Sequence, residues 1–175
     1  MSPHLETNPE ETDNGVAMLS EDTRKTIDHW VSKFPADKKR SALIQSLMAA
    51  QEQNGGWITR ELTEAVADYL DLPPVWAHEV VSFYSMFFTE PVGRHKVNIC
   101  TNISCWLNGA EEIVGHAEKK LGVRMGGTTE DGRITLVREE ECLAGCCGAP
   151  MAVVDGHYHE HLDLEKLDAL LDGLE

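Results

Sequence analysis

The sequence contains five cysteines, and four of them form two spaced pairs. Four residues separate Cys100 from Cys105, and three separate Cys142 from Cys146. Cysteine thiolates bind zinc and iron–sulfur clusters, and paired thiols also serve as redox dithiols. A 2Fe-2S cluster needs four thiolates, two for each iron. The pattern therefore indicates a site at which two distant pairs converge on one metal cofactor.

Spacing alone leaves three kinds of site open. Structural zinc sites use similarly close pairs, so both spacings fit zinc as well as iron. The plant-type ferredoxin spacing also begins with four intervening residues, but its following CxxC pair is missing here, and so is a thioredoxin-type catalytic CxxC. An iron–sulfur cluster, a zinc site and a dithiol oxidoreductase all remain as hypotheses.

The fifth cysteine, Cys147, directly follows Cys146. It could replace Cys146 as a ligand after a small shift of the loop, but the spacing of three residues favours Cys146. Free cysteines are mostly buried and pack like small apolar residues. We therefore expect Cys147 to be a packing residue beside the site.

Charge and composition exclude several classes of function. The chain has 15 Lys and Arg against 30 Asp and Glu, a formal net charge of -15, which argues against binding to nucleic acid or to anionic membranes. No stretch approaches about 18 consecutive apolar residues, so we expect no direct membrane insertion. Residues 1–19 are acidic and lack Lys and Arg, unlike a signal or transit peptide. We therefore expect a reducing, cytoplasmic compartment, in which cysteines are more often used for metal binding than for disulfides.

The first half of the chain is expected to be helical. Residues 1–19 lack periodicity and read as a flexible acidic extension, and residues 20–91 form a small helical domain. N-cap residues, glycines and prolines mark the helix ends. The predicted helices run from Ser20 to Phe34, from about Asp37 to Asn54, from Thr59 through Leu70, and from Pro73 through Phe87.

An aromatic-rich stretch closes this helical half. Trp76, Val80, Phe83 and Phe87 recur at helical spacing and are expected to face the helical core. The remaining large side chains of the same stretch are predicted to face outward and to dock a partner protein. These are Tyr84, Met86 and Phe88.

The pattern changes to mixed strands and helices at Pro91-Val92-Gly93, so residues 92–175 form a second domain. Strand, helix, strand, strand, helix is the order of a compact α/β sandwich of the thioredoxin type, and the whole chain is therefore α+β. Both cysteine pairs then lie on loops at the ends of elements. The predicted strands are His95–Cys100, Ile134–Val137 and Met151–Val154, and the helices are Leu107–Leu121 and a leucine-rich segment from Leu162 to Leu174.

Three alternating histidines follow the last predicted strand. His157, His159 and His161 could bind a metal from one strand face. Such clusters are more often solvated, and we expect a solvated loop here.

Several separated segments together resemble one known family. The runs CTNISCWLNGAEEI, GGTTEDGRITL and EECLAGCCGAPM, preceded by QEQNGGWI and VVSFYSMFFTEPVGRHKVNIC, are similar to the peripheral-arm 2Fe-2S subunit of NADH:quinone oxidoreductase, respiratory complex I. The similarity covers roughly residues 22–174. It implies a thioredoxin-like 2Fe-2S ferredoxin domain in which Cys100 and Cys105 bind one iron of the cluster, and Cys142 and Cys146 bind the other.

The resemblance also implies a function. The chain would carry one electron beside the flavin- and NADH-binding subunit, among other peripheral-arm subunits, with its cluster off the main electron path to quinone. It would lie at the inner face of the cell membrane through the complex. No GxGxxG or Walker motif occurs, so no complete active site is expected on this chain. The alternatives are the equivalent diaphorase subunit of an NAD-linked hydrogenase or formate dehydrogenase, and a zinc-stapled interaction module.

Overall fold

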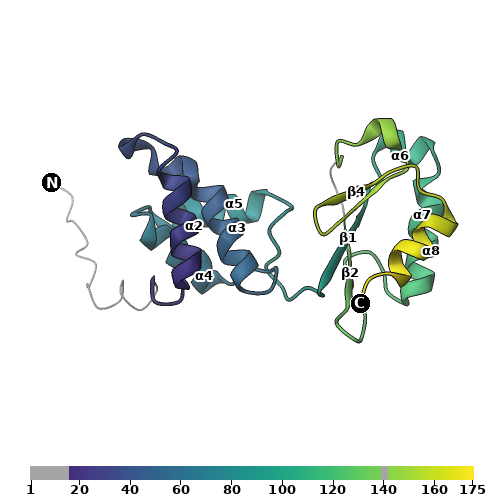
Figure 1. Ribbon diagram of the computed structural model, residues 1–175, viewed down its shortest axis with the longest axis horizontal. Helices are drawn as coiled ribbons and strands as arrows, with labels where there is room; N and C mark the ends of the chain where they lie inside the picture. The colour runs from purple at the N-terminus through teal and green to yellow at the C-terminus, as the bar shows by residue number, and fades with distance from the viewer. Residues whose placement is uncertain (1–15, 139–141) are drawn as a thin grey trace. The chain divides into compact units, whose positions relative to one another are not determined.

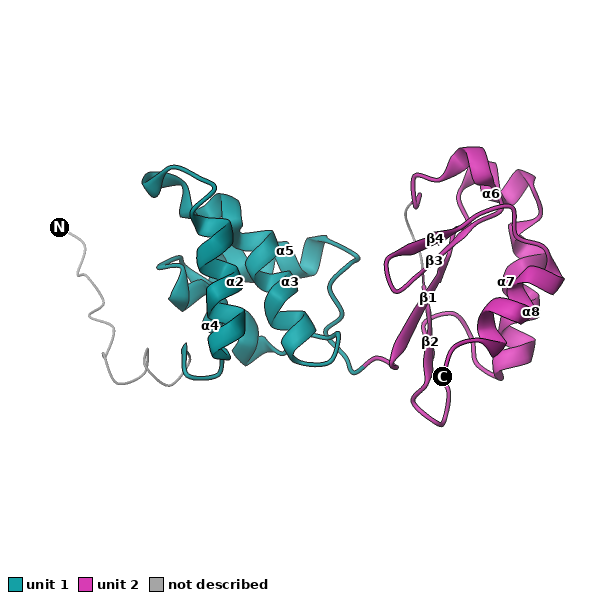
Figure 2. Ribbon diagram, in the orientation of Figure 1, with its two compact units in different colours: residues 1–91 teal, residues 92–175 magenta. Residues whose placement is uncertain are grey.

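The computed structural model describes residues 16–138 and 142–175. The chain divides into two compact units, Met1–Pro91 and Val92–Glu175 (Figure 2). Most of the predicted acidic extension, residues 1–15, lies outside the described residues. Leu19, at its end, is buried in the core of the first unit.

The first unit is a helical bundle around its own apolar core (Figure 1). Side chains from every α-helix of the unit contribute to that core, including Ile27, Leu47, Val66 and Ala77. The elements are α2 (Glu21–Val31), the 3-10 helix η1 (Ala36–Ala42), α3 (Leu43–Gln53), α4 (Arg60–Tyr69) and α5 (Pro74–Phe83).

Two predicted helix starts are confirmed by their caps. The side-chain oxygen of Ser20 accepts a hydrogen bond from the Thr23 N–H, and that of Thr59 accepts one from the Leu62 N–H. The prediction for the second helix is wrong at its start, because residues 36–42 form η1 and the α-helix begins at Leu43. No side chain caps an α-helix in this segment, and i→i+3 bonds of the 3-10 type satisfy its N–H groups instead.

The end of α5 also differs from the prediction. The helix stops at Phe83, since Tyr84 adopts an extended backbone with ψ 122°. Phe83 is 76% exposed, so its predicted place in the helical core is wrong, whereas Phe87 is buried from a position outside the helix. The Phe88 N–H donates to the Gln51 side chain, which ties this segment to α3 in place of another helical turn.

The second unit is a four-stranded sheet with helices on one face (Figure 1). The strand order is β2-β1-β3-β4, with β1 parallel to β2 and antiparallel to β3, and β3 and β4 form an antiparallel hairpin. The fold is thus mixed helix and sheet, as predicted. The strands are β1 (His95–Ile99), β2 (Ile134–Val137), β3 (Ala152–Val154) and β4 (His157–His159).

The helices of the second unit are α6 (Ile103–Leu107), α7 (Ala110–Leu121), the 3-10 helix η2 (Cys146–Gly148) and α8 (Leu164–Asp172). Alternate residues of β1, Val97 and Ile99, pack with α7 and α8 in one core. The predicted helix Leu107–Leu121 is in fact two helices, because Gly109 has φ 90° and breaks the helical backbone between them.

The prediction of a solvated loop for the three histidines is wrong in part, because His157–His159 form β4. This strand pairs with β3 across the turn at Asp155 and Gly156 and is an edge of the sheet. Among the described residues, we find no helix with the length and apolar character that a bilayer crossing requires.

Candidate metal centre

The first cysteine pair is positioned by regular elements and is buried. Cys100 directly follows β1, and its N–H donates to the Met151 carbonyl at 3.0 Å. Cys105 lies in α6, whose first turn is capped by the Asn102 side chain accepting from the Ile103 N–H. The two cysteines are 2% and 1% exposed and pack with Met151 in a small apolar cluster. The hydrophobic core therefore places this pair.

Burial raises the pKa of the Cys105 thiol to about 11. A hydrogen bond with Cys100 and the negative charge of Cys100 and Cys146 act in the same direction, while the backbone of Met151 donates to the sulfur and acts against them. Leu143, next to Cys142, packs against the apolar cluster that contains Cys100 and Cys105, so the loop of the second pair adjoins the first pair. A bound metal would supply the positive charge that deprotonates these thiols.

The second cysteine pair lies in a loop and is exposed. The Sγ atoms of Cys142 and Cys146 are 3.5 Å apart, and Cys146 begins η2. The backbone N–H of Ala144 donates to the Cys142 sulfur at 3.4 Å. Ala144 has φ 62°, a left-handed conformation that is uncommon outside glycine. All the cysteines are free thiols.

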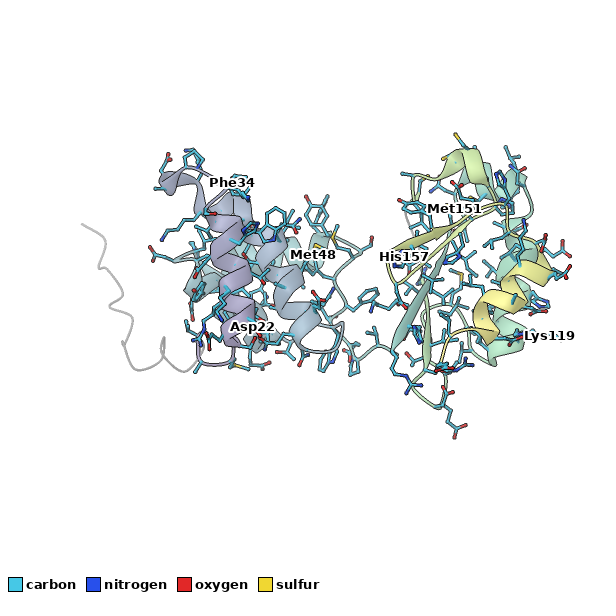
Figure 3. All side chains as sticks on the ribbon, viewed as in Figure 1. Asp22, Phe34, Met48, Lys119, Met151 and His157 are labelled. Carbon is cyan, nitrogen blue, oxygen red and sulfur yellow. The ribbon has the colours of Figure 1, made fainter. Side chains whose placement is uncertain are left out.

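Two glycines of this loop leave no room for a side chain. A Cβ atom on Gly145 would lie 2.8 Å from the Met151 Cε, and one on Gly148 would lie 2.5 Å from the Cβ, Cγ and Cδ atoms of Glu160. Figure 3 labels Met151 at the cysteine end of the β3–β4 hairpin and His157 near its turn. Because these two residues have no side chain, the cysteine loop can lie directly against the β3–β4 hairpin. The cysteines of η2 in this loop remain exposed.

The residues present fit a thiolate-bound cluster. Four free thiols occur as two pairs, backbone N–H groups reach two of the sulfurs, and small residues surround the second pair. Across the described ranges, no three His, Cys, Asp or Glu side chains are grouped so that they could hold a single metal ion. The assignment of Cys100, Cys105, Cys142 and Cys146 as ligands stays a prediction.

The structure also shows the surroundings of Cys147 and of the three histidines. Cys147 is exposed, so the expectation of a buried packing residue is wrong; the turn of η2 presents it to solvent. Of the three histidines, His157 and His159 lie on β4, and His161 follows it with φ 51°.

Sequence reasoning missed Tyr158, the central residue of β4. Its hydroxyl donates to the Leu143 carbonyl in the cysteine loop at 2.9 Å. The turn signal Asp155-Gly156 directly after a predicted strand could have indicated a returning strand and so revealed this residue.

Comparisons with known proteins agree on the kind of domain. The sequence profile described as "Thioredoxin-like [2Fe-2S] ferredoxin" matches residues 27–175. The E subunit of the NADH-quinone oxidoreductase of Rickettsia felis is 43% identical over 142 residues, which cover 81% of this chain and 84% of that protein. The E 2 subunit of the Rhizobium meliloti enzyme is 41% identical over 150 residues, covering 86% and 87% of the two chains.

A eukaryotic relative and a solved structure extend the comparison. NADH dehydrogenase [ubiquinone] flavoprotein 2, mitochondrial, of Dictyostelium discoideum is 36% identical over 174 residues, covering 99% of this chain and 70% of that protein. A crystal structure of an air-oxidised NAD+-reducing [NiFe]-hydrogenase shares the fold, with a TM-score of 0.61 and 24% identity over 73% of this chain. This chain matches 22% of the hydrogenase chain's length.

Proposed function

The chain belongs to the thioredoxin-like [2Fe-2S] ferredoxin family, and we propose that it is the electron-transfer subunit, with one 2Fe-2S cluster, of an NADH:quinone oxidoreductase. One observation carries this proposal: the loop with the free thiols of Cys142 and Cys146 adjoins the buried thiols of Cys100 and Cys105, because Leu143 packs against their apolar cluster. The relatives at 43% and 41% identity, both named as subunits of that enzyme, support the choice of complex.

In the proposed site, Cys100 and Cys105 bind one iron, and Cys142 and Cys146 bind the other. The cluster, when bound, supplies a centre that accepts and donates one electron. The chain's own residues shield the first pair from water and direct the N–H groups of Ala144 and Met151 to sulfur. Burial and N–H···S bonds are the means by which a protein sets the potential of such a centre.

An apolar surface beside the site supports a protein partner for electron transfer. Ile103, Trp106 and Leu107 are 70%, 52% and 70% exposed, and all lie on α6 together with Cys105. Exposed apolar and aromatic side chains in one place are typical of protein interfaces. We assign this α6 surface to the flavin- and NADH-binding subunit, which must approach the cluster to exchange electrons with it.

Further partners and the location follow from the same proposal. In the first unit, Val75, Phe83 and Met86 are exposed, and we assign this surface to other peripheral-arm subunits. Of the three residues predicted to dock a partner there, Met86 is exposed, whereas Tyr84 packs against the core. The chain would lie in the cytoplasm, at the inner face of the membrane, through those partners. The separate cores support the proposal that residues 20–91 and 92–175 are distinct domains.

Metal analysis of the anaerobically purified protein tests the cofactor. We expect two irons and two acid-labile sulfides for each chain, and an axial or rhombic 2Fe-2S signal in the electron paramagnetic resonance (EPR) spectrum after reduction. Stoichiometric zinc without sulfide would instead identify a zinc-stapled module. A protein that contains neither metal nor sulfide would be a dithiol protein. Either of these two results would refute the proposal.

Co-purification tests the partner. Trp106→Glu places a charge on the α6 surface and should reduce the amount of flavoprotein that co-purifies by about tenfold or more, because interface aromatics often contribute more than 1–2 kcal/mol. The matched control is Met18→Glu, at an exposed apolar residue of the first unit. The partner assignment is wrong if Trp106→Glu retains both the cluster and the flavoprotein.

A further inference from the structure

The Tyr158 hydroxyl, which the proposed function does not use, lies next to the second cysteine pair. We propose that Tyr158 is a positioning residue that holds the Leu143–Ala144 peptide group with its N–H directed at the Cys142 sulfur, and thereby raises the reduction potential of the cluster. This inference rests on the proposed function. It adds a residue outside the ligand set that controls how readily the site accepts its electron.

One peptide group of the cysteine loop is hydrogen-bonded at both ends. The Tyr158 hydroxyl donates to the Leu143 carbonyl at 2.9 Å, and the Ala144 N–H donates to the Cys142 Sγ at 3.4 Å. This carbonyl and this N–H belong to the same peptide bond. Because the bond is planar and trans, its C=O and N–H point in opposite directions. Fixing the carbonyl therefore fixes the direction of the N–H.

The backbone at this point needs an external contact to hold it. Ala144 has φ 62°, and non-glycine residues keep this conformation only where the surroundings determine it. Leu143 packs against the apolar cluster of the first pair, but Ala144 itself is exposed, so side-chain packing does not fix the orientation of the peptide group between them. The Tyr158 ring does approach the loop: a Cβ atom on Gly145 would lie 3.3 Å from its Cδ1.

The chain after β4 also binds the loop. The His161 N–H donates to the Gly148 carbonyl at 2.6 Å, and the Leu162 N–H donates to the Pro150 carbonyl at 2.8 Å. These bonds keep β4 beside the loop independently of the tyrosine hydroxyl. Removing that hydroxyl alone should therefore leave the loop in place and release only the orientation of one peptide group.

The effect on potential follows from charge. Reduction adds one electron, and a hydrogen bond to a ligand sulfur stabilises the more negative, reduced form more than the oxidised form. A hydrogen bond at the carbonyl polarises the peptide and strengthens the bond that its N–H makes. Tyr158 therefore favours reduction although it does not contact a ligand sulfur.

Tyr158→Phe tests this role, because it removes the hydroxyl and keeps the ring against Gly145. At a fixed solution potential we expect a roughly fivefold smaller ratio of reduced to oxidised cluster, a shift of the midpoint by about 40 mV to more negative values for a one-electron couple. Iron and sulfide content should stay unchanged. Potentiometric titration followed by EPR measures the shift.

Tyr69→Phe is the matched control. Its hydroxyl also donates a hydrogen bond, to the Asp28 Oδ1 at 3.0 Å, but it lies in the first unit. This variant should have the wild-type midpoint. Equal midpoints for the wild type and Tyr158→Phe, or an equal shift in Tyr69→Phe, would overturn the proposal.

A second measurement separates this inference from the proposed function. In the metal-free protein, NMR hydrogen exchange of the Ala144 amide should be several-fold faster in Tyr158→Phe than in the wild type, because a held N–H exchanges slowly. If the purified protein contains no iron, the proposed function fails while this exchange still reports on the tyrosine. Unchanged exchange would overturn the positioning role whatever the metal content.

Discussion

The two regions that carry the cysteine pairs are built in different ways. Cys100 and Cys105 belong to β1–α6, are almost completely buried, and share an apolar cluster with Met151. Cys142 and Cys146 lie in an exposed loop that polar and backbone contacts from β4 hold in place. Core packing thus positions the first pair, whereas the loop of the second pair, which Leu143 anchors to the same cluster, depends in addition on contacts with the edge strand β4. The two halves should therefore respond differently to substitution.

The largest effect is expected at the exposed pair. Cys142→Ser removes a proposed ligand and should reduce the iron and sulfide content of the purified protein by about tenfold or more, because each iron needs two thiolates. Cys147→Ser, a few residues away and also exposed, should retain the cluster. The ligand set would move to Cys147 if Cys147→Ser lost the cluster and Cys146→Ser kept it.

The buried pair should depend on packing. Met151 is fully buried between the cysteines and β3, so Met151→Ala should lower the free energy of unfolding of the second unit by about 2–5 kcal/mol. Urea-dependent hydrogen exchange of the strand amides measures this in the metal-free protein. Met48→Ala, at a 40% exposed position in the first unit, should change stability by less than about 1 kcal/mol. Equal changes in the free energy of unfolding for Met151→Ala and Met48→Ala would contradict the claim that core packing at Met151 positions the first cysteine pair.

The contact between the loop and the hairpin should be sensitive to one methyl group. Gly148→Ala places a Cβ atom 2.5 Å from Glu160 and should destabilise the second unit by about 1–3 kcal/mol. Gly115→Ala in α7 meets nothing within 4 Å and should stabilise by about 0.5–1 kcal/mol, since alanine favours a helix. In thermal unfolding, a lower stability of Gly148→Ala together with a higher stability of Gly115→Ala would support the tight packing of the loop. Wild-type stability of Gly148→Ala would argue against it.

The smallest effect is expected at the other end of the sheet. The Asp155 carboxylate, 2.7 Å from the His95 Nδ1, raises the pKa of His95, and the Glu175 carbonyl adds to this. The stabilisation is fully present below the unfolded pKa, about 6.5, and is lost as the pH rises through the raised pKa. His95→Gln should therefore cost roughly 1 kcal/mol near pH 6 and less near pH 8.5. A cost that grows with pH would contradict this, and iron content should not change.

Sequence reasoning succeeded where local signals decide the structure. Ser20 and Thr59 cap helices as expected, and the three predicted strands are present. It was less successful where tertiary contacts override periodicity. Phe83 continues the helical spacing but is exposed at the last position of α5, and Phe87 is buried outside the helix because the chain leaves the helix at Tyr84.

For the candidate site, too, the sequence predicts some features and not others. Four cysteines and their spacing can be read directly from the sequence, and a resemblance to a family adds the cofactor. The support of the second pair was not predicted: Asp155-Gly156 is a turn signal, but His157–His159 is too short and too polar for its periodicity to indicate a strand. Tyr158 therefore appeared only in the structure.

Mössbauer spectroscopy of the 57Fe-loaded protein tests most directly the claim that the site holds a 2Fe-2S cluster whose two irons are bound by sulfur alone. The account predicts two equal populations of high-spin ferric iron in tetrahedral sulfur coordination when oxidised, and one ferric and one ferrous site after one-electron reduction. A single mononuclear iron, or an iron with a nitrogen or oxygen ligand, would contradict it.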